Sequence, residues 1–256
     1  MLKDFTKEPF DILIQAGQSN AEGYGFGSAE KPWEPNERVW YLNENFTISQ
    51  AVESVTGNDI RSNFSLAFAR GYLENNLLAE GRSLLILRAA VGGTGFLDNN
   101  WKPNDVLYLR MLDMIKTALD LNGGNRLVAL LWHQGEQDAV LNASYETHYN
   151  HLMTLVRGVR ETFNVPGLPF VAGDFVQHWE QENMAICTPV VDAIRAVCRD
   201  CGRGAFVESD GLLSNAQFSK HHPFGWDDSV HFCRAAIYGL GERYFRAFTE
   251  ITGTDA

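Results

Sequence analysis

The sequence predicts an α/β fold in which a central parallel sheet of about five strands carries helices on both faces. Two observations predict it. Short apolar runs of strand length alternate with longer segments whose apolar residues recur at every third or fourth position. Several of these runs end directly in glycine- or amide-rich turns, where a backbone can leave a sheet sharply. We expect residues 1–256 to form a single domain, because this length suffices for one large core and no linker is evident.

Five apolar runs predict the strands. Each is too short for a helix and has a glycine at or near one of its ends. In chain order they are residues 12–16, 83–91, 126–132, 168–174 and 204–208. Residues 38–42 could form a short extra strand. The rest of the region 24–63 has no clear periodicity, so we expect a long loop there that helps to build a substrate pocket.

Five segments with helical spacing predict the helices. Their apolar residues fall on one face at steps of three and four, most clearly between residues 144 and 163. Glycines or prolines follow several of them and stop the pattern. The segments are residues 64–73, 106–121, 144–163, 190–198 and 234–249.

The charge of the chain limits its partners. Its 32 acidic side chains outnumber 21 Lys and Arg, for a formal net charge of −11. Nucleic acids and anionic membranes attract basic surfaces, so we expect neither as a partner. No stretch has the length of a membrane span, and the charged N-terminus lacks the apolar centre of a signal peptide. These features predict a cytoplasmic protein, or a secreted one if a signal segment has been trimmed.

Residues at the strand ends are suited to acyl transfer. Ser19 follows the first strand, where open α/β sheets bind their ligands, although a serine there could also be an ordinary N-cap. A serine needs a base, which His231 could supply, and Asp228 three residues earlier could orient the histidine ring. An oxyanion could be bound by the backbone N–H groups of Ser19 and Gly92 and by the side-chain amide of Gln134.

Four blocks of sequence resemble those of one superfamily. They are Gly17-Gln18-Ser19-Asn20, Gly92-Gly93-Thr94, Trp132-His133-Gln134-Gly135-Glu136-Gln137-Asp138 and Asp228-Ser229-Val230-His231-Phe232. In this order they resemble the SGNH hydrolases, specifically the carbohydrate-esterase branch of sialate O-acetylesterases and acetylxylan esterases. The resemblance runs from about Ile12 to about Tyr244 and implies a flavodoxin-like, three-layer α/β/α fold. It also implies serine ester hydrolysis without a metal or other cofactor, with Ser19 as nucleophile, His231 as base and Asp228 as its orienting acid.

Several further residues are expected to bind substrate or to support the site. Trp101 and Trp226 lie in polar loops near the motifs and could stack on a sugar. Glu136 and Asp138 could be the paired carboxylates of a glycosidase, but this spacing is more typical of residues that hold loops, and Glu136 should lie closer to the site. The complete set is Gln18, Asn20, Gly93, Glu136, Trp101 and Trp226.

The sequence therefore predicts an enzyme that hydrolyses O-acetyl or other small acyl esters of carbohydrates through an acyl-enzyme. Two alternatives stay open. One is a metal-dependent hydrolase that uses the cluster of His221, His222, Asp227, Asp228 and His231. The other is a catalytically silent carbohydrate-binding domain on the same fold. A lipid, thioester or aryl ester would be a different acyl substrate, although the polar loops favour a sugar.

Overall fold

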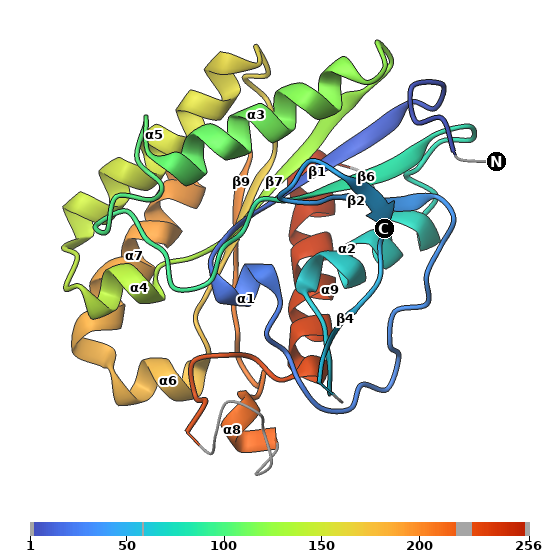
Figure 1. Cartoon of the computed structure of the whole chain (residues 1–256). Coiled ribbons are helices and arrows are strands. Elements are labelled where there is room, and N and C mark those ends of the chain that lie inside the picture. Colours follow the sequence, from blue (N-terminus) through green and yellow to red (C-terminus); the bar gives the residue numbers. More distant parts are fainter. Residues whose placement is uncertain (1–2, 58, 219–226, 254–256) are drawn as a thin grey trace.

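The computed structural model describes residues 3–57, 59–218 and 227–253, and a central sheet organises them (Figure 1). Within the described residues this sheet has seven strands in the order β3-β2-β6-β1-β7-β8-β9. The five predicted strands are all present and parallel, and along the chain they are β1 (Phe10–Gly17), β6 (Ser83–Arg88), β7 (Arg126–His133), β8 (Phe170–Gly173) and β9 (Gly204–Val207). Numbered one to five, they lie in the order 2-1-3-4-5, which is flavodoxin-like.

The region 24–63 contains more strand than the sequence predicts. β2 (Val39–Leu42) pairs in parallel with β6, which confirms the extra strand at 38–42. β3 (Ile48–Gln50) then pairs antiparallel with β2, and β4 (Ser54–Thr56) forms a hairpin with β5 (Asp59–Arg61). The expectation of a loop after residue 42 was wrong here. These strands have three residues each and are largely exposed, so they carry no alternating apolar pattern.

Helices cover both faces of the sheet. α3 (Val106–Asp120), α5 (Tyr145–Thr162) and α7 (Met184–Asp200) pack on one face, and α2 (Phe64–Glu74) and α9 (Arg234–Thr252) pack on the other. Alternate residues of β1 enter the two cores: Ile12 and Ile14 face the first group of helices, and Leu13 faces the second. This confirms the three-layer α/β/α fold.

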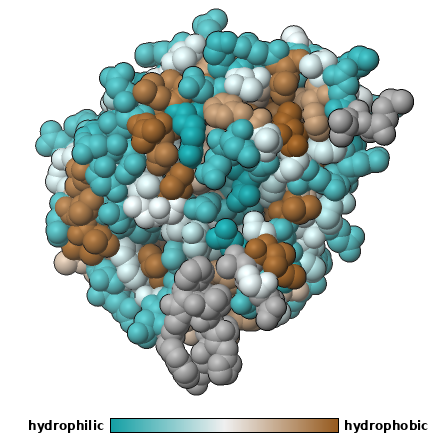
Figure 2. Space-filling view, in the orientation of Figure 1, coloured by the Kyte–Doolittle hydropathy of each residue, from teal (hydrophilic) through white to brown (hydrophobic). Residues whose placement is uncertain are grey.

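The short helices escaped prediction. They are α1 (Ser19–Glu22), α4 (Glu136–Val140), α6 (Gln177–Glu182) and α8 (Asn215–Phe218). Helices of one or two turns are too short to show a period, yet α1 and α4 follow strand ends and carry residues of the predicted site. In the described part of the chain, no helix has the length and apolarity needed to span a bilayer. The face seen in Figure 2 is mostly hydrophilic, with separate hydrophobic patches.

Candidate active site

The turn after β1 places Ser19 at the carboxyl edge of the sheet. Gly17 has a φ of +125°, and a Cβ there would lie 2.1 Å from the backbone oxygen of His133, so only glycine fits. Gln18 donates its backbone N–H to that same oxygen at 2.9 Å. Gln18 is the N-cap of α1 and Ser19 is the first helical residue, so the N-cap interpretation of Ser19 was wrong. The Ser19 side chain therefore does not serve as a helix cap.

His231 and Asp228 form a close pair before α9. The ring Nδ1 of His231 lies 2.6 Å from Oδ1 of Asp228. The other carboxylate oxygen of Asp228 accepts a hydrogen bond from Nδ2 of Asn215 at 2.8 Å. A carboxylate at Nδ1 favours the tautomer that carries its proton there, which leaves Nε2 as the acceptor nitrogen of the ring. His231 is thus oriented as a base would need to be.

Ser19 and His231 line the same cavity, whose volume is about 390 Å³. Six of the predicted site residues line it: Gln18, Ser19, Gly92, Gly93, Glu136 and His231. Within the described residues no hydrogen bond joins Ser19 Oγ to the His231 ring. Catalytic hydrogen bonds are often long before substrate binds, so the shared cavity is the more informative observation.

Two of the three predicted oxyanion donors lie at this cavity. Ser19 is only 6% exposed and lies against Gly92, where an added Cβ would come within 3.4 Å of the Ser19 Cβ. The backbone N–H of Gly92 donates to Oε2 of Glu22 at 2.8 Å. Gln134 is fully buried, is not among the residues lining the cavity, and donates from Nε2 to Asp138 Oδ2 at 2.8 Å. Its role as an oxyanion donor stays a prediction.

Asn20 connects the serine turn to the histidine loop. Its Nδ2 donates to the backbone oxygen of Val230 at 2.9 Å, and its Oδ1 accepts the backbone N–H of Phe232 at 3.1 Å. These contacts hold the chain on both sides of His231. The same Nδ2 donates to Oε1 of Glu136 at 2.8 Å. Burial raises the pKa of Glu136, and the hydrogen bond from Asn20 opposes that shift.

Asp138 supports the loop after β6 that contains Gly92 and Gly93, here called the glycine turn, instead of facing a substrate. Its carboxylate is buried and accepts the backbone N–H groups of Phe96 and Leu97 at 3.1 and 2.8 Å, besides the Gln134 amide. Burial would raise the pKa of Asp138, but His148 and these N–H groups outweigh it and lower the pKa. Asp138 thus ties the loop after β6 to the end of β7. Only Glu136 of the two carboxylates lines the cavity, so they are not a glycosidase pair.

The structure corrects one tryptophan assignment and leaves another outside its description. Trp101 is fully buried, packs on Trp132 with ring centroids 5.1 Å apart, and donates to Thr94 Oγ1 at 3.0 Å. It cannot stack on a sugar, and its polar sequence neighbours misled the prediction. Trp226, His221 and His222 lie outside the described residues. In the part that is described, no group of three or more His, Cys, Asp or Glu side chains could hold a metal ion.

Sequence reasoning missed three residues that surround the His231–Asp228 pair. The Tyr24 ring stacks on His231, with centroids 5.1 Å apart and an angle of 21° between the rings. The guanidinium of Arg61 lies over the same Tyr24 ring, 4.8 Å from its centroid. Asn215 donates both to Asp228 and to the backbone oxygen of Tyr24. These residues come from segments without regular periodicity, so no sequence signal pointed to them.

Solved structures of other proteins share this fold. The crystal structure of NanS matches with a TM-score of 0.82 and 18% identity over 97% of this chain and 99% of that chain. A protein from Arabidopsis thaliana matches with a TM-score of 0.70 and 21% identity, over 94% of this chain and 98% of that chain. A carbohydrate acetylesterase from Xanthomonas citri matches with a TM-score of 0.60 and 14% identity, over 96% of this chain and 57% of that chain.

Sequence comparison identifies the family. Residues 9–250 match the model described as carbohydrate esterase, sialic acid-specific acetylesterase. A probable carbohydrate esterase from Arabidopsis thaliana is 26% identical over 181 residues, 64% of this chain and 68% of that protein. A probable 9-O-acetyl-N-acetylneuraminic acid deacetylase from Escherichia coli K12 is 26% identical over 88 residues, 32% of this chain and 27% of that protein. The chain therefore belongs to this family of carbohydrate esterases, and it is a carboxylic ester hydrolase, which confirms the resemblance seen in the four blocks.

Proposed function

We propose that this esterase removes acetyl or similarly small acyl groups from carbohydrate hydroxyls by a serine mechanism. The observation that carries the proposal is the cavity shared by Ser19 and by His231, whose ring is oriented by Asp228. A buried serine beside a carboxylate-oriented histidine is the arrangement that activates a hydroxyl for attack on an ester. The family description and the name of the bacterial relative make O-acetylated sialic acid the first substrate to test.

The proposed reaction has two steps. Ser19 Oγ attacks the ester carbonyl carbon while its proton passes to Nε2 of His231, and Asp228 stabilises the imidazolium. The C–O bond to the sugar then breaks, and His231 returns the proton to the departing sugar oxygen. In the second step His231 takes a proton from water as the water oxygen attacks the acyl-enzyme. His231 then passes that proton to Ser19 Oγ as the bond between Oγ and the acyl carbon breaks, and the carboxylic acid is released.

Charge that develops on the carbonyl oxygen would be stabilised by backbone N–H groups. The N–H of Ser19 makes no hydrogen bond within the described residues, and it opens the short helix α1. The N–H of Gly92, which donates to Oε2 of Glu22 in this structure, would be the second donor. Each such donor is typically worth about 3 kcal/mol of transition-state stabilisation.

The cavity wall favours a small acyl group. Val140, Trp179 and Val230 also line the cavity and offer apolar contacts to a methyl group. Val140 is more than half exposed, so the cavity is open there. This combination suits an acetyl group on a larger polar substrate that extends out of the cavity.

The test compares the wild type with Ser19→Ala on p-nitrophenyl acetate and O-acetylated sialic acid, with EDTA present. Ser28→Ala is the matched control, because Ser28 is exposed. We expect kcat of Ser19→Ala to fall about 10⁴-fold or more while its circular dichroism and melting curve stay unchanged. Activity within tenfold of the wild type would remove Ser19 from its role. Loss of wild-type activity in EDTA that added metal restores would favour a metal-dependent hydrolase.

A further inference from the structure

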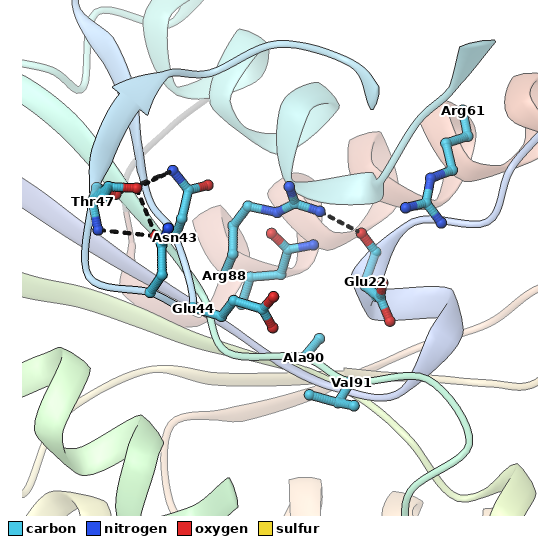
Figure 3. Close-up of a pocket in the computed structure, with 10 residues that line it drawn as sticks. Glu22, Asn43, Glu44, Thr47, Arg61, Arg88, Ala90 and Val91 are labelled. Atoms are coloured by element: carbon cyan, nitrogen blue, oxygen red, sulfur yellow. Dashed lines mark hydrogen bonds between the residues drawn. The ribbon is translucent and has the colours of Figure 1, made fainter. Parts of the chain in front are cut away.

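We propose that a second cavity beside Ser19 binds the carboxylate of a sugar-acid substrate through Arg61 and Arg88. The inference rests on the proposed function and names the class of sugar that the esterase accepts. Both arginines line this cavity, whose volume is about 330 Å³. It is distinct from the Ser19 cavity and is lined largely by polar and charged side chains (Figure 3).

The two cavities share a wall. Glu22 lines the second cavity, and its carboxylate accepts the N–H of Gly92, which lines the first. Val91 and Gly92 are consecutive residues that line the second and the first cavity respectively. A substrate whose ester carbonyl lies at Ser19 can therefore reach the second cavity with another part of the same sugar.

Arg61 is a cationic side chain suited to binding an anion. Within residues 3–57, 59–218 and 227–253 its guanidinium makes no hydrogen bond and no ion pair, and its Nε is buried without a partner. It lies 4.8 Å above the Tyr24 ring, which stacks on His231. A charged group that is partly withdrawn from water and left unpaired is costly unless a ligand pairs with it. Arg61 lines the second cavity and is linked to His231 through the Tyr24 ring, so a substrate is its natural partner.

Arg88 reaches the same place from the sheet. It is the last residue of β6, lies 5.0 Å from the Tyr41 ring, and donates from Nη2 to the backbone oxygen of Glu22 at 3.2 Å. Figure 3 shows the Arg61 and Arg88 side chains directed toward Glu22 from two sides. Arginine has five N–H donors in a planar fork that matches a carboxylate. Within the described residues Arg88 uses one of these donors, and the others are open to a ligand.

The acidic residues of the cavity do not neutralise these arginines in the described part of the chain. Glu44 is 71% exposed and lies 3.7 Å from Arg110 instead. Glu22 accepts the N–H of Gly92 with its Oε2. Since the whole chain carries a formal charge of −11, general attraction of anions is not expected. Recognition of a carboxylate would therefore come from Arg61 and Arg88 themselves.

The experiment measures a preference, which does not depend on absolute activity. We would determine kcat/KM for O-acetylated sialic acid and for the same sugar with its carboxylate converted to the primary amide. We expect the wild type to prefer the carboxylate about tenfold or more, since hydrogen bonds to charged groups are the stronger ones. Arg61→Gln and Arg88→Gln should reduce that ratio to near one, mainly through KM, and Arg61→Lys should keep part of it.

Arg70→Gln is the matched control. Arg70 also lies over a tyrosine ring, 5.4 Å from Tyr238, but it lines neither of the two cavities. Its substitution should leave the ratio unchanged. A second readout avoids turnover: Ser19→Ala should bind free sialic acid more tightly than the amide by calorimetry, and Ser19→Ala/Arg61→Gln should not distinguish them.

The outcomes separate the two proposals. Hydrolysis of both substrates by the wild type with a ratio near one overturns the inference and leaves the proposed function intact. A preference that survives both Arg61→Gln and Arg88→Gln also overturns it, because other residues must then recognise the carboxylate. If the folded wild type hydrolyses no acetyl ester, the proposed function is wrong, and the calorimetric comparison still decides whether the arginines bind a carboxylate.

Discussion

Ser19 and Arg61 lie near the same histidine but are held in different ways. Ser19 follows a fully buried strand, and the turn that presents it is fixed by Gly17 and by backbone hydrogen bonds to β7. Arg61 lies on a hairpin of three-residue strands with exposed neighbours, and within the described residues it contacts the site only through the Tyr24 ring. Ser19, the proposed nucleophile, is thus positioned by the sheet, whereas Arg61, which we propose contacts the sugar, is positioned by a hairpin outside that sheet.

The difference suggests where the molecule tolerates change. Strand ends are fixed by packing on both faces, so the catalytic geometry should depend on buried polar contacts behind the cavity. An exposed hairpin with few contacts can vary without loss of the core. Substitutions behind the cavity should therefore affect kcat, and substitutions on the hairpin should affect the choice of substrate.

The largest effect that sharpens this comparison is expected at Asn20. Asn20→Ala removes the hydrogen bonds to Val230 and Phe232 and leaves the buried Glu136 carboxylate without its donor. Because the loop then no longer fixes His231, we expect kcat on an acetyl ester to fall about 100-fold with little change in KM. The free energy of unfolding should also fall, by about 1–3 kcal/mol.

The control for Asn20→Ala is Asn122→Ala, which removes a hydrogen bond to the Thr6 backbone oxygen far from the cavity. It should leave kcat unchanged. A loss of stability in Asn20→Ala with full kcat would show that the residue supports the fold alone. In that case the distinction between the two regions would not extend to catalysis.

The sequence was sufficient to predict the part of the site that the sheet carries. Ser19, Gly92 and Glu136 follow apolar runs whose ends must meet at one edge, and the structure brings all three to one cavity with His231. The central strands were predictable for the same reason, since burial on both faces demands continuous apolar residues.

The rest depends on contacts that no local pattern records. Trp101 is surrounded by polar residues in the sequence but packs on Trp132 in the core. Arg61 is brought near His231 only through Tyr24, across segments that lack a period. Gln134 was expected at the cavity, but a buried carboxylate four residues later holds its amide. Contacts between distant segments decided the positions of Trp101 and Arg61, and a hydrogen bond within one short segment decided that of Gln134.

The dependence of the rate on pH tests whether His231 acts as the proposed base. Protonated His231 cannot accept the Ser19 proton, so kcat/KM should rise from acidic to neutral pH. His133, the last residue of β7, does not complicate the profile, because burial lowers its pKa to about 3 and keeps its ring neutral. Measuring kcat/KM on p-nitrophenyl acetate across this range decides the matter. A flat profile would count against His231 as the base.

The smallest effect concerns Asp174, a strand-end carboxylate that follows β8 and lines neither of the two cavities. Burial, with the charges of Glu180 and Glu208, raises its pKa to about 7 despite Arg195. Between its ordinary pKa of 3.8 and about 7, the folded state keeps a proton that the unfolded state releases. Stability should therefore fall as pH rises through that window, by about 2 kcal/mol between pH 5 and 8. Asp174→Asn should remove this loss, because an amide oxygen can still accept the backbone N–H of Phe175.

Urea unfolding of the wild type and Asp174→Asn at pH 5 and pH 8 measures the difference, with the exposed Asp192→Asn as control. Equal pH dependence in the wild type and Asp174→Asn would mean that Asp174 ionises as freely in the folded chain as in the unfolded one. The expected result would instead separate two carboxylates that the sheet buries in the same way. Asp138 is compensated by His148 and by N–H donors and supports the glycine turn. Arg195 and the N–H of Phe175 do not offset the burial of Asp174, so its ionised form destabilises the fold above about pH 7.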